Sequence, residues 1–128
     1  MCLTKSEKTC RKGRLTVYKV LLKTSKGLIT PYMKTPVKLG ETLQSIMPYS
    51  KKADRFSIIT GEGVHAYISL ERAIKEYKEW SFIFRDSPIS PVIYEAIIPD
   101  VEYWLGTDED VASVELLITN KQVYPNEE

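Results

Sequence analysis

Several residue types that mark common protein classes are scarce in this chain. It contains two cysteines, Cys2 and Cys10, and one histidine, His65. The cysteines lack the C-x-x-C spacing of redox and zinc pairs, so the sequence predicts no thiol-based centre. A disulfide between them would close a small loop outside the main body, and a reducing compartment is the simpler interpretation. We therefore expect a cytoplasmic protein.

Long apolar runs and an excess of one charge are also missing. The apolar segment nearest the start, residues 15–22, is interrupted by Lys19 and is too short for a membrane span or a secretory signal. The chain has 18 Lys and Arg residues against 17 Asp and Glu residues, a net charge of +1. Neither membrane insertion nor dedicated nucleic-acid binding is expected from such a chain.

The motifs of common enzyme classes are absent. There is no G-x-S-x-G elbow, and one histidine among many serines does not single out a catalytic triad. Gly61 and Gly63 form a G-x-G step without the third glycine or the Lys-Ser/Thr pair of nucleotide-binding loops. The acidic run 108–110 lacks the spacing of a calcium-binding loop. The sequence therefore predicts no catalytic residue, metal site or cofactor, and it favours a protein without enzymatic activity.

The composition is that of an ordinary globular domain. Hydrophobic residues make up 43% of the 128 positions and charged residues 27%, which is enough for one core. Five basic residues crowd the start of the chain, namely Lys5, Lys8, Arg11, Lys12 and Arg14. We expect a basic arm over residues 1–14, a single domain over 15–119 and a polar tail over 120–128.

Segments rich in β-branched and aromatic residues predict the strands. They cover residues 15–24, 28–30, 55–60, 64–68, 92–98, 101–105 and 112–119. Gly27 favours a hairpin between the first two, and Pro99 with Asp100 interrupts the later pair. The fold class predicted is α+β, with a mostly antiparallel sheet of about 5-6 strands.

One main amphipathic helix is predicted over residues 70–80 or so. Ser69 can cap it, and Leu70, Ala73, Ile74 and Tyr77 recur at helical spacing on one face. We expect this stripe to pack on the sheet. Between Pro31 and Pro48, the run 41–47 is the one stretch that could form a short helix.

The step from the strand 64–68 into the helix is the candidate binding site. A helix start presents free N–H groups, so an anion or phosphate could lie near Ser69 with His65 and Tyr67 beside it. The alternative is that His65 is an ordinary surface or half-buried strand residue. The eight tyrosines and two tryptophans could line a groove, but core packing is the favoured interpretation.

The segment from Gly63 to Ala73 carries a resemblance. Its Gly-x-His-Ala-aromatic strand leads into a Ser-Leu-Glu-x-x-Ala helix, and this resembles small uncharacterised proteins of bacteriophages and gut bacteria. Looser similarity extends to residues 94–99 and 112–115. The resemblance implies a phage or mobile-element origin. Our leading hypothesis is a non-enzymatic accessory protein that binds a host protein or a small nucleotide-like ligand around His65, Tyr67 and the late aromatic strands.

Two alternatives remain open. The chain is distantly similar to ADP-ribosyltransferase-like folds in three features: a tyrosine in the first strand, the His-aromatic-x-Ser step and a late strand with Glu115. That likeness implies a small enzyme or its inactive relic, with Tyr18, His65, Ser69 and Glu115 in one pocket. The other alternative is a structural or homo-oligomeric module, expected if the largest exposed apolar patch is self-complementary. The candidate ligand-binding residues are thus His65, Tyr67, Ser69, Tyr18 and Glu115.

Overall fold

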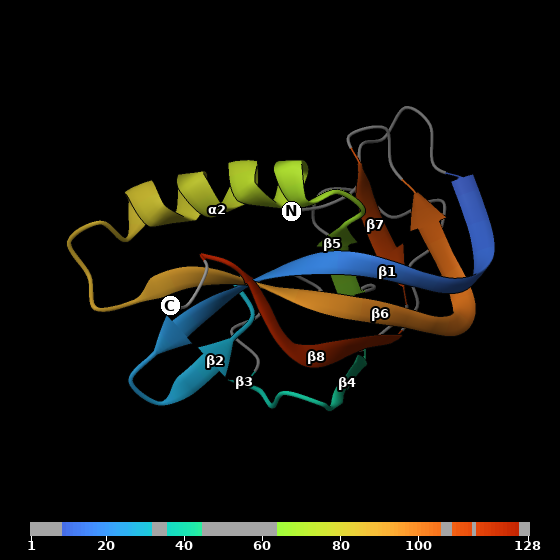
Figure 1. Cartoon of the computed structure of the whole chain (residues 1–128), viewed down its shortest axis with the longest axis horizontal. Coiled ribbons are helices and arrows are strands. Elements are labelled where there is room, and N and C mark those ends of the chain that lie inside the picture. The colour runs from blue at the N-terminus through green and yellow to red at the C-terminus, as the bar shows by residue number, and fades with distance from the viewer. Residues whose placement is uncertain (1–8, 32–35, 45–63, 106–108, 114, 126–128) are drawn as a thin grey trace.

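One antiparallel sheet and one helix make up the described part of the chain (Figure 1). The structure is a computed structural model that describes residues 9–31, 36–44, 64–105, 109–113 and 115–125. The strands are β1 (Thr9–Thr24), β2 (Gly27–Ile29), β3 (Pro36–Val37), β4 (Thr42–Gln44), β5 (Val64–Tyr67), β6 (Ser90–Leu105), β7 (Asp110–Ser113) and β8 (Glu115–Tyr124). The helix α2 (Leu70–Ile83) lies between β5 and β6 along the chain.

β1 and β6 form the central ribbon of the sheet. Each has 16 residues, and they pair from Thr9 opposite Leu105 to Lys23 opposite Ser90. The register shifts after Gly13, which has a φ of 139° that suits glycine. Two residues of β6, Pro99 and Asp100, here oppose one residue of β1, which is the pattern of a β-bulge. The missing N–H of proline costs little at such a point.

Four strands close into a ring at one end of the ribbon. β5 pairs with β1 at Tyr67 opposite Tyr18, and its other edge pairs with β7. β7 pairs in turn with β6, through Ser113 opposite Tyr103. Because β6 also pairs with β1, the ladders β1–β5–β7–β6 return to their starting strand. Closure of this kind removes exposed strand edges.

At the other end of the β1–β6 ribbon, the outer strands of the sheet curve towards each other. β2 and β3 extend the β1 side, and β8 and β4 extend the β6 side. The connection from β3 to β4 crosses to β8, where Gly40 N–H donates to the Ile118 carbonyl at 2.7 Å and Ile118 N–H donates to the Glu41 carbonyl at 3.2 Å. The two outermost strands, β3 and β4, therefore approach each other over one apolar core. Its buried members are Val17, Leu21, Val37, Ala66, Val92, Ala96, Ile98, Tyr103, Val111, Leu116 and Ile118.

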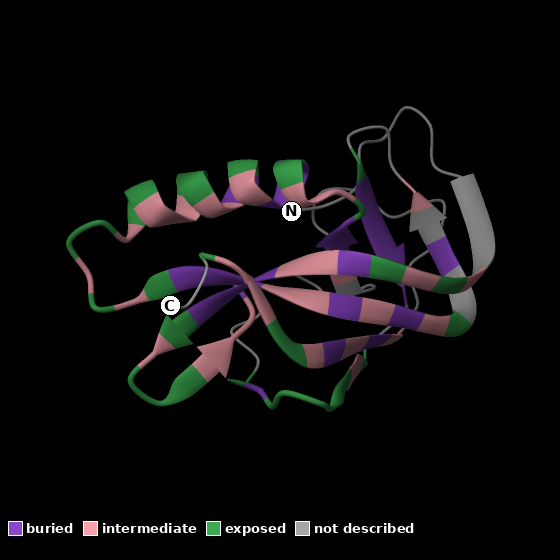
Figure 2. Ribbon diagram, viewed as in Figure 1, coloured by how far each residue is buried: buried purple, intermediate pink, exposed green. Residues whose placement is uncertain are grey.

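The helix α2 covers the opposite face of the ribbon. Alternation along β1 sends Val17 and Leu21 to the core and Val20 to the helix. Val20, Tyr67, Ala73 and Ile93 form the buried layer beneath α2. Figure 2 shows exposed residues along the outer side of α2 and buried or intermediate ones on the side facing the sheet.

The predicted fold class and the main helix are confirmed, and the strand number is corrected. The described sheet has eight strands instead of about 5-6. Two of the additional strands are the short β3 and β4, which lie in a stretch where the sequence has no strand pattern. β4 occupies part of the run 41–47 that could have formed a short helix, because Leu43 pairs with Leu116. The predicted strand 55–60 lies outside the described residues.

The sheet also extends past the expected domain limits. β1 begins at Thr9 and so includes the last residues of the expected basic arm. β8 continues to Tyr124, inside the expected polar tail. The predicted interruption at Pro99 is the β-bulge, and β6 continues through it.

Removing a core side chain tests this packing. Leu116 is 1% exposed, whereas Leu39 is 41% exposed on the β3–β4 connection. We expect Leu116→Ala to lower the free energy of unfolding by about 2–5 kcal/mol, and Leu39→Ala to lower it by under about 1 kcal/mol. Urea unfolding of both variants measures the difference. Equal losses would contradict the placement of Leu116.

Candidate functional site

Four of the five predicted site residues gather where β5 leads into α2. Tyr18 of β1 lies directly opposite Tyr67 of β5. His65 is two residues before Tyr67 and so shares its face of the strand. Ser69 follows as the N-cap of α2, with φ −121° and ψ 146°. The sequence pattern therefore located a real junction between a strand and a helix.

Glu115, the fifth predicted residue, lies elsewhere. In the β5–β7 ladder, Tyr67 is opposite Asp110 and Val64 is opposite Ser113. Glu115 follows Ser113 and pairs with Gln44 of β4. Glu115 is the first residue of β8, whereas Asp110, which lies opposite Tyr67, is the first residue of β7. The described strand pairings do not place Glu115 opposite Tyr18, His65 or Ser69, and the ADP-ribosyltransferase alternative stays a prediction.

The N-terminus of α2 already has a carboxylate of its own. Ser69 Oγ accepts a hydrogen bond from Arg72 N–H at 3.2 Å and donates to the carboxylate of Glu109. The Glu109 carbonyl accepts from Ile68 N–H at 2.8 Å. Glu71 adds a second acidic residue in the first turn. Because carboxylates fill the position that favours negative charge, an external anion near Ser69 would be repelled.

A cluster of buried charges lies beside this junction. Arg72 and Glu76, one turn apart on α2, are 8% and 3% exposed, and their Nη1 and Oε2 atoms are 3.6 Å apart. The Arg72 guanidinium lies over the Tyr67 ring, 4.7 Å from its centroid. Asp110, opposite Tyr67 on β7, is 3% exposed. Sequence reasoning missed this cluster, although Arg72 and Glu76 have the i,i+4 spacing of an ion pair next to the apolar stripe.

Lys19 of β1 belongs to the same cluster. Its Nζ donates to the His65 carbonyl at 2.6 Å. Part of the side chain is exposed, but the ammonium end is enclosed. Burial lowers the pKa of Lys19 from 10.5 to about 8, against the opposing effect of the Glu76 carboxylate, which raises it. Two cations, Lys19 and Arg72, therefore act on the single carboxylate of Glu76.

The arrangement is suited to holding α2 on the sheet. Tyr67 is 6% exposed and is covered by Arg72, while Ser69 is occupied by its cap and by Glu109. A buried ion pair adds little net stability, because the cost of taking both charges out of water offsets their attraction. Of the predicted groove aromatics, Tyr103 is buried in the core and Tyr94 packs against it, in agreement with the core-packing interpretation.

The C-terminal end of α2 is the exposed counterpart of this junction. Phe82 is 66% exposed and Ile83 is 61% exposed, the highest values among the large hydrophobic residues described. Phe82 follows Trp80 by two positions, about 200° around the helix, so it faces away when Trp80 faces the sheet. Trp80 stacks on Phe84 with centroids 5.8 Å apart, beside the layer that includes Tyr77.

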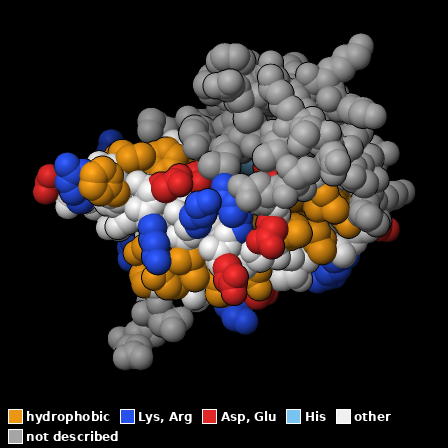
Figure 3. Space-filling view, turned by 90° about the horizontal axis from the view of Figure 1, so that it is seen from above, with side chains coloured by type: hydrophobic (Ala, Val, Ile, Leu, Met, Phe, Trp, Pro, Cys, Tyr) orange, Lys and Arg blue, Asp and Glu red, His pale blue; other side chains and the backbone are white. Residues whose placement is uncertain are grey.

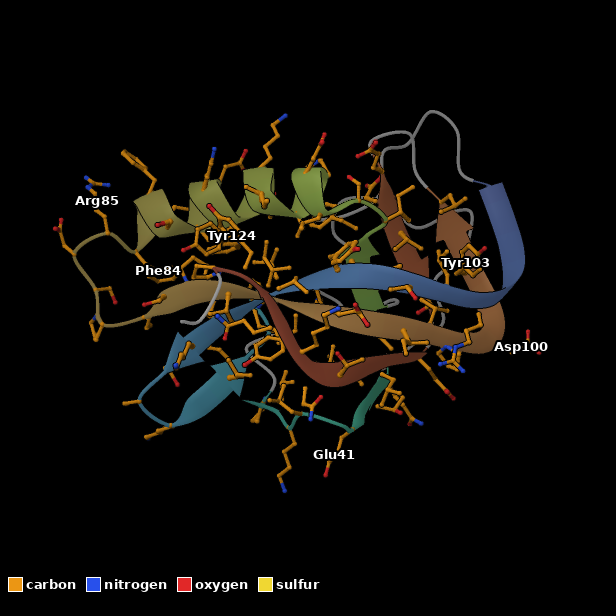
Figure 4. The ribbon with its side chains drawn as sticks, in the orientation of Figure 1. Glu41, Phe84, Arg85, Asp100, Tyr103 and Tyr124 are labelled. Atoms are coloured by element: carbon orange, nitrogen blue, oxygen red, sulfur yellow. The ribbon has the colours of Figure 1, made fainter. Side chains whose placement is uncertain are left out.

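Charged residues surround these two apolar side chains. The Arg85 guanidinium lies 4.3 Å from the Phe82 ring centroid, and its Nη1 donates to the Phe82 carbonyl at 2.9 Å. In Figure 4, Arg85 lies beyond the helix end and points away from the sheet. Figure 3 shows apolar side chains beside charged ones at the same end of the molecule. We call this surface the α2 end patch; it consists of Lys78, Glu79, Phe82, Ile83, Arg85 and Asp86.

Comparison of the chain with protein-family models, with curated proteins and with solved structures finds no match. In the described ranges, no three His, Cys, Asp or Glu side chains lie close enough together to hold a metal ion. No helix in the same ranges is long and apolar enough to cross a membrane. The functional argument therefore depends on the two surfaces of α2.

The titration of Lys19 has a measurable consequence for stability. Between pH 8 and 10 the unfolded chain holds the Lys19 proton more tightly than the folded protein, so folding stability should rise with pH. We expect a contribution of at most about 1.4 kcal/mol per pH unit, which Lys19→Met should abolish. Urea unfolding of both proteins from pH 7 to 10 measures the difference in slope.

The pH range of this comparison is set by a second group. Burial, with the neighbouring Tyr124, raises the pKa of Tyr77 above its usual value, so Tyr77 titrates beyond this range in both proteins. Identical slopes for the wild type and Lys19→Met would show that the Lys19 ammonium is not enclosed.

A double-mutant cycle tests the buried ion pair. Arg72→Met removes the arginine that pairs with the enclosed Glu76 carboxylate, and we expect the free energy of unfolding to fall by about 3–5 kcal/mol. Adding Glu76→Leu should recover part of that loss, because the unpaired carboxylate is then removed while the enclosed Lys19 ammonium loses its counter-charge. The exposed i,i+4 pair on the same helix, Lys75→Met with Glu79→Leu, is the matched control, with an expected change below about 0.5 kcal/mol. If the losses in free energy of unfolding caused by Arg72→Met and Glu76→Leu simply add in the double variant, the two residues are not coupled.

Proposed function

We propose that this protein is a non-enzymatic accessory protein that binds another protein through the α2 end patch. The observation that carries the proposal is the exposure of Phe82 and Ile83 to 66% and 61% at the end of an otherwise amphipathic helix. A single exposed apolar residue is ordinary, but adjacent Phe and Ile side chains flanked by an arginine have the composition of an interface centre.

The other surface of α2 supports binding less well. Two groups at the β5–α2 junction that could contact a ligand already form hydrogen bonds within the chain: Ser69 with Glu109, and Lys19 with the His65 carbonyl. A nucleotide-like ligand would bring negative charge to a place where Glu109 and Glu71 already lie. By contrast, Phe82 and Ile83 present apolar surface to water, and burying it against a partner is favourable.

The likeness of residues 63–73 to phage and gut-bacterial proteins supports a phage or mobile-element origin for this accessory protein. Such an origin favours a partner among the proteins present in a bacterial cell. It does not bear on catalysis, and none of the contacts in the buried charge cluster requires a substrate.

A photo-cross-linking experiment tests the proposal. A benzophenone amino acid at Ile83 should give a protein adduct when the protein is expressed in bacterial cells. The same amino acid at Glu41, which is exposed on the opposite side of the molecule (Figure 4), should give none. Adding Phe82→Ser should reduce the adduct at least about tenfold while changing stability by less than about 0.5 kcal/mol. Equal adduct yields at Ile83 and Glu41 would overturn the proposal.

A further inference from the structure

The last strand of the sheet has a regular first half and an irregular second half. The first half of β8, residues 115–118, has partners in both β4 and β6. Over residues 119–124 the register with β6 shifts twice, and no strand in the described part of the chain pairs with the other edge. A segment held at one edge by an irregular ladder opens at less cost than one paired at both edges. We call the end of β8, Gln122–Tyr124, the strap.

The strap reaches the side of α2 that faces the sheet (Figures 1 and 4). Tyr124 is opposite Ile93 of β6, and its ring meets the Tyr77 ring of α2 edge-on, with the centroids 4.8 Å apart. Val123 and Tyr124 pack against the buried layer beneath α2, as Tyr77 and Trp80 do. The strap therefore covers part of the inner side of the second half of α2.

Opening the strap uncovers a strand edge and aromatic side chains at one place. Residues 93–94 of β6 lose their partner strand, so backbone N–H and C=O groups on this edge can bond to another chain. The Tyr77 ring loses its contact with Tyr124, and the apolar layer that includes Trp80 loses the cover of Val123. Backbone groups that give affinity, beside a place for a side chain that gives specificity, are the parts of a strand-addition site.

From these contacts we propose that the strap is a releasable internal ligand, and that the site beneath it binds an extended peptide segment of a partner protein, with an aromatic residue in the place of Tyr124. The occupant is inferred from what the site holds in the closed state, which is an extended strand ending in a tyrosine. The site is on the inner side of α2, whereas Phe82 of the α2 end patch is exposed on the outer side. The inference therefore goes beyond the function proposed above and does not depend on it.

A labelled peptide with the sequence of residues 118–125 tests the site in trans. In the full chain, Tyr124→Ser weakens the strap and raises the open fraction, so the peptide should bind this variant at least about tenfold more tightly than the wild type. Fluorescence anisotropy measures both affinities, and the same peptide with Tyr124→Ser should bind neither protein. Equal affinities for the two proteins would overturn the role of the strap. Absence of peptide binding to both, up to millimolar concentration, would overturn the site.

Two further substitutions in the Tyr124→Ser chain locate the bound peptide. Tyr77→Ala removes the ring that meets Tyr124 and should weaken peptide binding at least about fivefold. Lys75→Ala, two positions earlier on the exposed side of α2, is the matched control and should leave the affinity unchanged. If both substitutions leave the affinity unchanged, the peptide binds elsewhere and the proposal fails.

Amide hydrogen exchange of the wild-type chain checks the opening without any substitution. The strap amides should exchange by local opening, at rates that low urea concentrations hardly change, because little surface is exposed. The amide of Leu116, which is 1% exposed, should exchange faster as urea is added. Strap amides that exchange only together with Leu116 would overturn the proposal. Cross-linking at Ile83 is a separate measurement, so the proposed function can stand or fail by itself.

Discussion

The antiparallel pairing of β1 with β6 is the interaction on which the rest of the structure depends. Every other strand except the short β3 and β4 pairs with one of these two, and α2 packs across them. The register is fixed because a slip of one residue would turn Val17 and Leu21 toward the helix and Val20 into the core. The bulge at Pro99 and Asp100 lets the ribbon bend, so that one stretch closes the four-stranded ring and the other curls around the core.

Helix α2 needs a second constraint, because an apolar stripe alone can slide along a sheet. Arg72 over Tyr67 of β5 and the contact of Ser69 with Glu109 join α2 to its surroundings near its first two turns. Each contact depends on a particular position along the helix axis, so together they set its translation and rotation. Glu109 adopts a φ of 58°, which is uncommon for a residue other than glycine. Its carbonyl and its carboxylate both bond at the helix start, and these contacts hold the conformation in place.

Local patterns in the sequence predicted the elements, and long-range pairing decided the rest. Ser69 and the spacing of Leu70, Ala73, Ile74 and Tyr77 located the helix, because capping and amphipathicity are properties of neighbouring residues. The strand β4 exists because its partner Leu116 is in place, and closure of the ring needs segments far apart in the chain. For the site, the sequence located the β5–α2 junction but not its burial. Arg72 and Glu76 are residue types found mostly at the surface, and only the tertiary packing encloses them.

The two ends of α2 use similar residues for opposite purposes, and burial is what separates them. At the first end Arg72 and Glu76 are enclosed, and the Arg72 guanidinium lies over Tyr67 of β5, so the contact joins the helix to the sheet. At the second end Lys78, Glu79, Arg85 and Asp86 are exposed to water, where an ion pair such as Arg85–Asp86 is weak. A helix that is held firmly at one end presents its other end in one orientation, which lowers the entropy cost of docking. For the partner binding proposed above, the buried cluster has its role without touching the partner, by keeping Phe82 and Ile83 in place.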